Sequence, residues 1–310
     1  LPIETGEIPE SGTEFDAIVV GGGPGGSSAA GYLAKSGARV LLIEKDVWPR
    51  DKICGDAVGG KSLSHVNELG VKADLESTPH FRVTGIVFSS PKGNSVRVPL
   101  PEEDVQRLEA GYALPRAQFD SLLFNRCQAM VREADGLVIQ GGEVRSVLFD
   151  DGAGGEDPGE GTGDARHASG VVVRIGGRNG EERTYYTREL VGAAGYRCPV
   201  ARSVVESSYN EVMMDRDHYC GGYREYWQNV KGCETNVGDI EIHFVDSVIP
   251  GYFWLFPVSE NVVNVGIGMV MGLLDKQKKK LKALQADVIA NHPMFKERFA
   301  EAEMVPGSAK

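Results

Sequence analysis

Hydrophobic and polar residues follow two different periods in the first part of this chain. Residues 16–20 and 39–43 are short, mostly apolar runs, as expected for strands buried within a sheet. Between them, residues 25–36 are rich in alanine with apolar positions at helical spacing, and Gly37 follows as a helix-ending residue. This order predicts a strand, a helix and a second strand, the unit from which dinucleotide-binding domains are built.

The pattern changes farther along the chain. A helix is predicted to begin near Arg116, and strands are predicted at 81–100, 137–149, 171–175, 183–186 and 189–193. Residues 204–271 contain longer strands rich in aromatic residues, and residues 271–302 have apolar positions at helical spacing. We therefore expect an α/β fold in which a Rossmann-like domain is interleaved with an α+β substrate domain built on an antiparallel sheet.

The expected domain boundaries follow from these patterns. They are 1–14 for a loose arm, 15–80 and 112–203 for the dinucleotide-binding domain, 81–111 and 204–272 for the substrate domain, and 273–310 for a helix leading back toward the first domain. Residues 151–170 are rich in glycine and acidic residues, which predicts a disordered or hairpin-tip insertion.

Composition narrows the class of protein. The 310 residues carry a net charge of −11, which argues against nucleic acid as a partner. No apolar run approaches the ~20 residues that a membrane-spanning helix needs, and no signal-peptide pattern is visible at the start. The five cysteines include no C-x-x-C pair. Free thiols in a reducing, cytoplasmic setting are the simplest interpretation, and a metal site has no support.

Three glycines after the first predicted strand carry the clearest chemical signal. In G-x-G-x-x-G, Gly21 allows a tight turn, Gly23 lets the backbone approach a pyrophosphate, and Gly26 lets the helix pack on the strand. The helix N-terminus offers N–H groups and partial positive charge to phosphates. Glu44 lies 18 residues beyond Gly26, where a carboxylate accepts hydrogen bonds from an adenosine ribose. The candidate nucleotide-binding residues are Gly21, Gly23, Pro24, Gly25, Gly26, Glu44 and Lys45.

Two further candidates have an equally simple structural interpretation. Cys54-Gly55-Asp56 either lies over a flavin or a substrate, or contains a small buried thiol. Arg116 either holds a cofactor phosphate or ribose through its guanidinium, or forms a surface ion pair.

Two later stretches are also open to two interpretations. Residues 191–202 are a buried strand that ends in Ala194-Gly195 before a helix, which either brings backbone close to a ligand or is a plain turn. Tyr252, Trp254 and Phe256 alternate, so they share one face of a strand. They either line an apolar pocket or pack in the core.

Taken together, these residues resemble the geranylgeranyl reductase family, within the larger group of flavoproteins built like p-hydroxybenzoate hydroxylase. The resemblance covers nearly everything from Phe15 to Lys310. Its most specific piece is Tyr252-x-Trp254-x-Phe256-Pro257 followed by Asn264-Val265-Gly266-x-Gly268. Other matching pieces are Cys54-Gly55-Asp56, similar to the family's Cys-Gly element near the flavin, Arg116-x-x-Phe119-Asp120, similar to its helix that touches FAD, and Val144, at the position whose backbone borders the adenine.

The resemblance implies an FAD-dependent oxidoreductase that reduces isolated C=C bonds of a geranylgeranyl or other prenyl chain, in a lipid or a prenylated pigment precursor. Reduction of the FAD by NAD(P)H or by a ferredoxin-like donor is left open. Tyr252 and Cys54 are then candidates for the acid or for its positioning, and Trp254 and Phe256 belong to the dry pocket that holds the alkene. The family's second FAD motif is expected after Lys310, so we expect a C-terminally truncated chain.

Other functions remain open from sequence alone. The same fold serves flavin-dependent monooxygenases and halogenases, whose W-x-W-x-I-P signature differs at Tyr252 and Phe256. It also serves electron-transfer flavoprotein–quinone oxidoreductases, and a non-catalytic FAD-binding remnant is the last alternative. A late basic run is either a solvated face or a peripheral contact with anionic lipid headgroups; its members are Lys276, Lys278, Lys279, Lys280 and Lys282.

Overall fold

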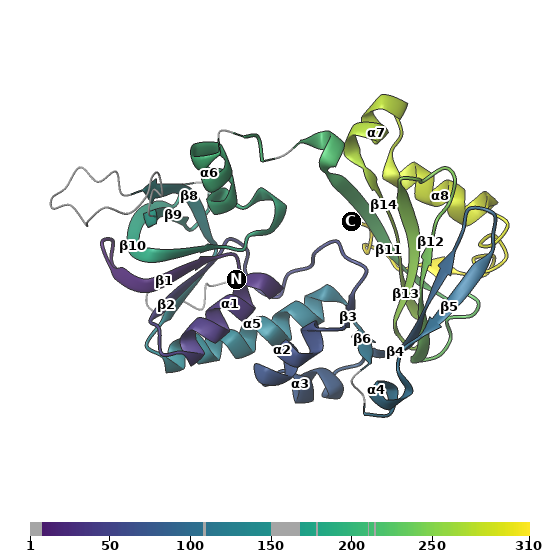
Figure 1. The fold of residues 1–310 in the computed structure, drawn as a ribbon, viewed down its shortest axis with the longest axis horizontal. Helices are drawn as coiled ribbons and strands as arrows, with labels where there is room; N and C mark the ends of the chain where they lie inside the picture. The colour runs from purple at the N-terminus through teal and green to yellow at the C-terminus, as the bar shows by residue number, and fades with distance from the viewer. Residues whose placement is uncertain (1–7, 108–109, 150–167, 178, 210, 214) are drawn as a thin grey trace. The chain divides into compact units, whose positions relative to one another are not determined.

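The structure is a computed structural model that describes residues 8–107, 110–149, 168–177, 179–209, 211–213 and 215–310 (Figure 1). The described residues form two compact units. The first takes its residues from Leu1–Arg50, Leu69–Val71 and Asp120–Met213, and the second from Asp51–Glu68, Lys72–Phe119 and Met214–Lys310. Residues 51–68, which the sequence assigned to the dinucleotide-binding domain, thus cluster with the second unit.

In its described residues, the first unit has a six-stranded sheet. Its order is β7 (Leu137–Gln140), β2 (Val40–Glu44), β1 (Glu14–Val20), β10 (Glu181–Gly192), β9 (Ala168–Ile175) and β8 (Gly142–Phe149). The first four strands are parallel, and β10, β9 and β8 are antiparallel. This arrangement confirms the predicted strand–helix–strand unit.

Helices cover both faces of this sheet. Helix α1 (Pro24–Lys35) packs on β1 and β2, and it lies beside α5 (Arg116–Glu133), where Gly31 faces the thiol of Cys127 (Figure 1). Helix α6 (Pro199–Ser208) packs on β8 and β10 after the 3₁₀ turn η1 (Gly195–Arg197). The core between α6 and the sheet is apolar and includes Ile18, Val20, Leu41, Ile43, Val173, Cys198 and Val200.

Three sequence-based expectations for this unit need correction. Residues 137–149 form two strands, because Gly141 between them has a φ of +74°. The predicted strands 183–186 and 189–193 are one long strand, β10. Residues 8–13 of the predicted loose arm are held in place, since the carbonyl of Pro9 accepts hydrogen bonds from Arg183 and from the Tyr185 hydroxyl. The expected insertion at 151–170 lies mostly outside the described residues.

In its described residues, the second unit is built on one large sheet, and its pairing is antiparallel except between β12 and β4. The strand order is β15 (Glu303–Met304), β11 (Cys220–Gln228), β14 (Val262–Val270), β13 (Gly251–Ser259), β12 (Val237–His243), β4 (Phe81–Ser89), β6 (Gly111–Ala113) and β3 (Ala57–Gly59), with β5 (Ser95–Pro99) paired to β4. Its short helices are α2 (Ser62–Glu68), α3 (Lys72–Ser77), α4 (Glu102–Gln106) and the 3₁₀ turn η2 (Arg216–His218).

Two helices cover one face of this sheet (Figure 1). Phe253 and Leu255 of β13 point into an apolar cluster with Leu274 of α7 (Met271–Gln277) and Leu284 of α8 (Leu281–Asn291). The single helix predicted over 271–302 is instead two helices, because Lys278 has left-handed backbone with a φ of +52° and ends α7. The second helix ends at Asn291, because the residue before a proline is biased away from helical backbone. Since neighbouring strand residues point to opposite faces, Tyr252, Trp254 and Phe256 belong to the face opposite these two helices.

All five cysteines are free thiols. Within the described residues, no helix is both long and apolar enough to cross a bilayer.

Candidate functional site

The first unit contains the glycine turn between β1 and α1. Gly21 has a φ of +106°, and a Cβ there would lie 2.6 Å from the carbonyl oxygen of Ala193 at the end of β10. A Cβ on Gly26 would lie 1.7 Å from the carbonyl oxygen of Gly21. Only glycine fits at either position, so the residue type lets α1 begin directly against the ends of β1 and β10.

The N-terminus of α1 is open to a ligand. Its N-cap is Gly23, which makes no side-chain capping hydrogen bond, and Pro24 follows as the first helical residue. A Cβ on Gly25 would meet no heavy atom of the described residues within 4 Å. Uncapped N–H groups and the helix dipole together favour an anion at this position. This geometry fits the pyrophosphate of a dinucleotide such as FAD.

The carboxylate of Glu44 supports the glycine turn from the end of β2. Its Oε2 atom accepts a 2.6 Å hydrogen bond from the backbone N–H of Gly22, and Oε1 accepts one of 2.9 Å from Asp46. Each carboxylate oxygen has two acceptor positions, so each retains one for a ribose hydroxyl. Glu44 therefore shapes the turn in addition to being the expected ribose ligand.

Arg50 is a half-buried cation that the sequence pattern did not identify. Its Nη1 atom lies 3.4 Å from Asp120 Oδ2, and its Nη2 atom lies 3.8 Å from Glu44 Oε2. Its guanidinium stacks on the ring of Trp48, and a Cβ on Gly23 would lie 3.2 Å from Nη2. A guanidinium in this position is suited to a phosphate group. The signal was weak because the residues around Arg50 match no nucleotide motif.

The remaining candidates of the first unit are spread over three elements. Gly195 has a φ of +74° and begins η1, directly after the Ala193–Ala194 backbone that touches Gly21. Lys45 is exposed after β2, and Val144 lies on β8, which β10 and β9 separate from β1. The structure thus places Gly195 beside the glycine turn and Val144 on the edge strand.

In the second unit, the indole of Trp254 lies across neighbouring strands where glycines make room for it. A Cβ on Gly266 of β14 would lie 2.0 Å from Trp254 Cζ2. A Cβ on Gly268 would lie 3.8 Å from Cζ3, and one on Gly222 of β11 would lie 4.0 Å from Cη2. On the face of the sheet opposite α7 and α8, these glycines therefore leave room for the Trp254 ring. Tyr252, at 41% exposure, has its ring centroid 5.8 Å from that of Trp254.

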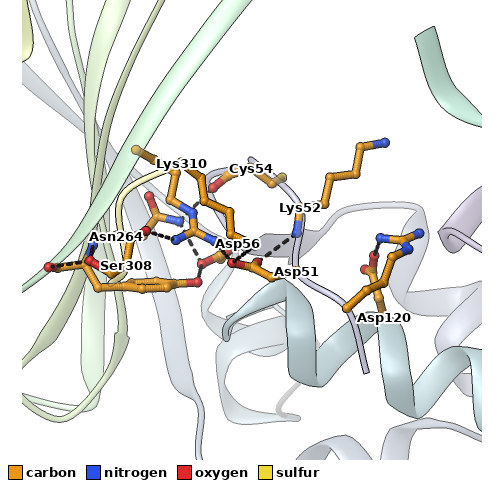
Figure 2. A network of polar contacts seen from close by, with 11 residues as sticks. Asp51, Lys52, Cys54, Asp56, Asp120, Asn264, Ser308 and Lys310 are labelled. Carbon is orange, nitrogen blue, oxygen red and sulfur yellow. Dashed lines mark hydrogen bonds and ion pairs between the residues drawn. The ribbon is translucent and has the colours of Figure 1, made fainter. Parts of the chain in front are cut away.

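The segment Asp51–Asp56 lies over this face, which we call the aromatic face. Ile53 is 3.5 Å from the Cβ position of Gly222, and a Cβ on Gly55 would lie 2.7 Å from the ring of Phe256. The Cys54 carbonyl accepts a 2.7 Å hydrogen bond from the side chain of Asn264 on β14 (Figure 2). The structure therefore brings the Cys54-Gly55-Asp56 candidate together with Trp254 and Phe256.

Asp56 is fully buried in the polar network drawn in Figure 2. Its Oδ2 atom accepts hydrogen bonds from the Tyr226 hydroxyl at 2.6 Å and from Asn264 at 2.7 Å. Burial raises the pKa of Asp56 to about 6, against the opposing effect of these two hydrogen bonds and of the Arg224 charge. The Oδ1 atom is buried with no hydrogen-bond partner within the described residues.

A second ionic group lies beside this carboxyl. Arg224 is fully buried, forms an ion pair with Asp51, donates a 2.7 Å hydrogen bond to the Ser308 carbonyl and lies over the ring of Tyr226. Lys310 Nζ lies 3.2 Å from Asp51. Burial alone would raise the pKa of Asp51, but the hydrogen bonds and charges of Arg224 and Lys310 together outweigh it and hold that pKa below its usual value. The sequence missed this group because Asp51 and Arg224 are 173 positions apart.

Arg116 is the first residue of α5 and belongs to the second unit. A cavity of about 260 Å³ in this unit is lined by Pro79, Pro115, Gln118, Tyr226, Gln228, Val258, Ser259, Val262 and Val305. It is smaller than the ~300–1,000 Å³ of typical ligand pockets, so we do not assign a substrate to it.

Comparison with known protein families gives one match for the N-terminal part of the chain and another for the C-terminal part. Residues 14–216 match the model of the FAD binding domain, and residues 218–307 match that of the geranylgeranyl reductase catalytic domain. The chain therefore belongs to the FAD-binding flavoproteins. The second match confirms the resemblance to the geranylgeranyl reductase family that the sequence motifs indicated.

Individual relatives share low sequence identity with this chain but align with most of its length. The menaquinone reductase of Mycobacterium tuberculosis is 28% identical over 255 residues, which are 82% of this chain and 54% of that protein. The digeranylgeranylglycerophospholipid reductase of Sulfolobus acidocaldarius is 29% identical over 268 residues, 84% of this chain and 51% of that protein. The chain thus spans about half the length of these two reductases.

Among solved structures, the myxobacterial chondrochloren halogenase CndH, an FAD-dependent halogenase, superposes with a TM-score of 0.72 at 25% identity. The match covers 96% of this chain and 61% of the halogenase. The α/β flavoprotein fold is thereby confirmed.

Proposed function

We propose that this chain carries out FAD-dependent reduction of isolated C=C bonds in a prenyl chain borne by a lipid or another prenylated small molecule. The observation that carries the proposal is the aromatic face, where Trp254 and Phe256 are packed under the Cys54 segment. Support comes from the match of residues 218–307 to the geranylgeranyl reductase catalytic domain and from relatives named menaquinone reductase and digeranylgeranylglycerophospholipid reductase.

The first unit supplies the features needed to hold the ADP half of FAD. The uncapped N-terminus of α1 takes the pyrophosphate, Glu44 takes the ribose, and Arg50 lies close enough to the turn to add a positive charge. Bound FAD supplies the hydride once it is reduced, by NAD(P)H or by a ferredoxin-like donor.

The aromatic face of the second unit supplies an apolar surface for the alkene. An isolated C=C bond is a poor electrophile, so its reduction depends on holding the alkene in a dry, fixed orientation. Trp254 and Phe256 provide that surface, and the Cys54 thiol and the Tyr252 hydroxyl are the proposed sources of a proton or the groups that position it. Tyr252 is accessible at the edge of the face.

Contact with a membrane surface fits this class of substrate. Lys278, Lys279 and Lys280 are exposed between α7 and α8, and Lys282 is exposed in the first turn of α8. Clustered lysines attract anionic lipid headgroups. We propose that this end of the second unit contacts the membrane peripherally from the cytoplasmic side.

The proposal is tested by turnover under anaerobic conditions. The chain is loaded with FAD, reduced with dithionite and mixed with a geranylgeranyl lipid or a prenylated quinone, and the product is weighed by mass spectrometry. We expect the mass to rise by two hydrogen atoms for each bond saturated. Unchanged substrate, with turnover only of an aromatic substrate in the presence of oxygen and NAD(P)H, would favour the monooxygenase or halogenase alternative.

A further inference from the structure

The side chain of Asn264 joins the Cys54 segment to the aromatic face. It is fully buried, and its Oδ1 atom accepts a 2.9 Å hydrogen bond from the indole N–H of Trp254. Its Nδ2 group donates to the Cys54 carbonyl and to Asp56 Oδ2, each at 2.7 Å. An indole N–H can only donate and a carbonyl can only accept, so these partners fix the orientation of the amide.

Asp56 holds this amide in turn. Its Oδ2 atom receives two donors, from Asn264 and Tyr226, while Oδ1 is buried without a partner within the described residues. A proton taken up by the carboxyl therefore goes to Oδ1 and leaves both hydrogen bonds in place. The backbone of Asp56 has a φ of +70°, in the left-handed region that residues with a side chain adopt uncommonly and aspartate more readily than most.

We propose that Asn264 and Asp56 are positioning residues that lock the Trp254 indole and the Cys54 carbonyl into one rigid arrangement. The lock itself is a property of this chain, and only its consequence for alkene reduction rests on the proposed function. Without the amide, the Trp254 N–H and the Cys54 carbonyl would be buried and unpaired, so the indole would reorient or the segment would move toward water. Either change would misplace the surface against which an alkene is held.

The polar and charged groups that face the Asp56 carboxyl come from three elements of the second unit. Arg224 and Tyr226 approach Asp56 from β11, Asn264 approaches it from β14, and the Arg116 backbone approaches it from the start of α5. Arg224 is paired to Asp51, which also pairs with Lys310. A substitution of Asp56 therefore changes the charge beside Arg224 without removing the carboxylate partner of Arg224.

Indole NMR tests the lock directly, without flavin or substrate. The chain has three tryptophans, and Trp254→Phe assigns the Trp254 indole resonance. In Asn264→Ala we expect this resonance to shift and its hydrogen exchange to accelerate by roughly tenfold or more, the loss expected for one buried hydrogen bond. The indole of Trp227 donates to Glu225 instead, so its resonance, like that of Trp48, serves as the control for intact folding.

The two carboxyl variants separate positioning from general destabilisation. Asp56→Asn keeps an acceptor oxygen for Asn264 and Tyr226, so it should retain the wild-type Trp254 resonance, whereas Asp56→Ala should reproduce the effect of Asn264→Ala. If Asn264→Ala does not fold, the comparison of Asp56→Asn with Asp56→Ala tests the positioning role by itself. An unshifted, slowly exchanging Trp254 indole in Asp56→Ala or in folded Asn264→Ala would overturn the lock.

Turnover then tests the consequence of the lock. In the chain saturated with FAD, Asp56→Ala should lower kcat for alkene reduction by tenfold or more, and Asp56→Asn should restore it. Unchanged kcat in Asp56→Ala would overturn the positioning role. If the wild-type chain reduces no prenyl alkene, the proposed function fails, while the indole spectra still decide whether the lock exists.

Discussion

The indole of Trp254 occupies the space directly above Gly266, where a methyl group would lie 2.0 Å from its Cζ2 atom. Gly266→Ala must therefore displace the ring or the strand, and overpacking of this kind costs about 1–3 kcal/mol. We expect a lower melting temperature and a loss of alkene reduction greater than the loss of stability. Gly268→Ala is the matched control, because its Cβ would make an ordinary 3.8 Å contact with the same ring. Equal melting temperatures for the two variants would contradict the tight fit.

The hydrogen bond from Gly22 to Glu44 makes a second prediction about the glycine turn. Glu44→Ala leaves the buried N–H of Gly22 without an acceptor, which costs about 1–3 kcal/mol. We expect lower stability and weaker FAD binding, measured by the quenching of flavin fluorescence on titration. Glu44→Gln keeps one acceptor oxygen and should lie between the wild type and Glu44→Ala. If Glu44→Ala binds FAD as tightly as the wild type, the carboxylate has no part in the nucleotide site.

The raised pKa of Asp56 predicts how stability depends on pH. The folded chain holds the Asp56 proton up to about pH 6, whereas an unfolded aspartic acid releases it near its ordinary value of 3.8. Stability therefore falls as pH rises through this window and stays lower above it. The difference between the folded and the ordinary pKa of Asp56 corresponds to roughly 3 kcal/mol of unfolding free energy.

Asp56→Asn removes this titration while keeping an acceptor oxygen. We expect its free energy of unfolding, relative to wild type, to rise between about pH 4 and pH 7 and to level off above. Denaturant unfolding at several pH values measures the difference. A difference that does not change with pH would show that the Asp56 carboxyl titrates normally.

The exposed lysines between α7 and α8 predict binding to anionic membranes. Each lysine near such a surface contributes about 1 kcal/mol, so reversing Lys278, Lys279 and Lys280 to Glu should weaken binding to phosphatidylglycerol vesicles by about 10²-fold or more. The control reverses three exposed lysines elsewhere, Lys35, Lys92 and Lys296, and makes the same change in net charge. Sedimentation with vesicles measures both. Equal losses of vesicle binding in the two variants would show that binding depends on the net charge of the chain and not on the position of these lysines.

The strand–helix–strand unit and its glycine turn were predictable because their signals are local. Gly21, Gly26 and Glu44 lie within one 24-residue stretch, and each has a residue type that its backbone or its hydrogen bond requires. Tyr252, Trp254 and Phe256 could likewise be placed on one face of a strand from their alternation alone. The end of the last helix was predictable in principle from His292-Pro293, which the apolar spacing obscured.

The polar network was not predictable because its partners are far apart in sequence. Asn264 lies 208 positions from Asp56, and no periodic pattern links them. Asp51–Asp56 has neither helical nor strand period, so only the tertiary structure shows that it covers the aromatic face. Arg224 alternates with Gly222 and Tyr226 along β11 and so shares one face with them. Its partner Asp51 could not be identified from spacing.

A single turnover of the reduced flavoprotein tests the central claim most directly. The FAD-loaded chain is reduced under anaerobic conditions, freed of excess reductant and mixed with a geranylgeranyl substrate, while the visible absorbance of the flavin is followed. The account predicts that the oxidised flavin spectrum returns and that one C=C bond is saturated for each flavin reoxidised. A flavin that stays reduced with the prenyl substrate and reoxidises only when oxygen is admitted would contradict it.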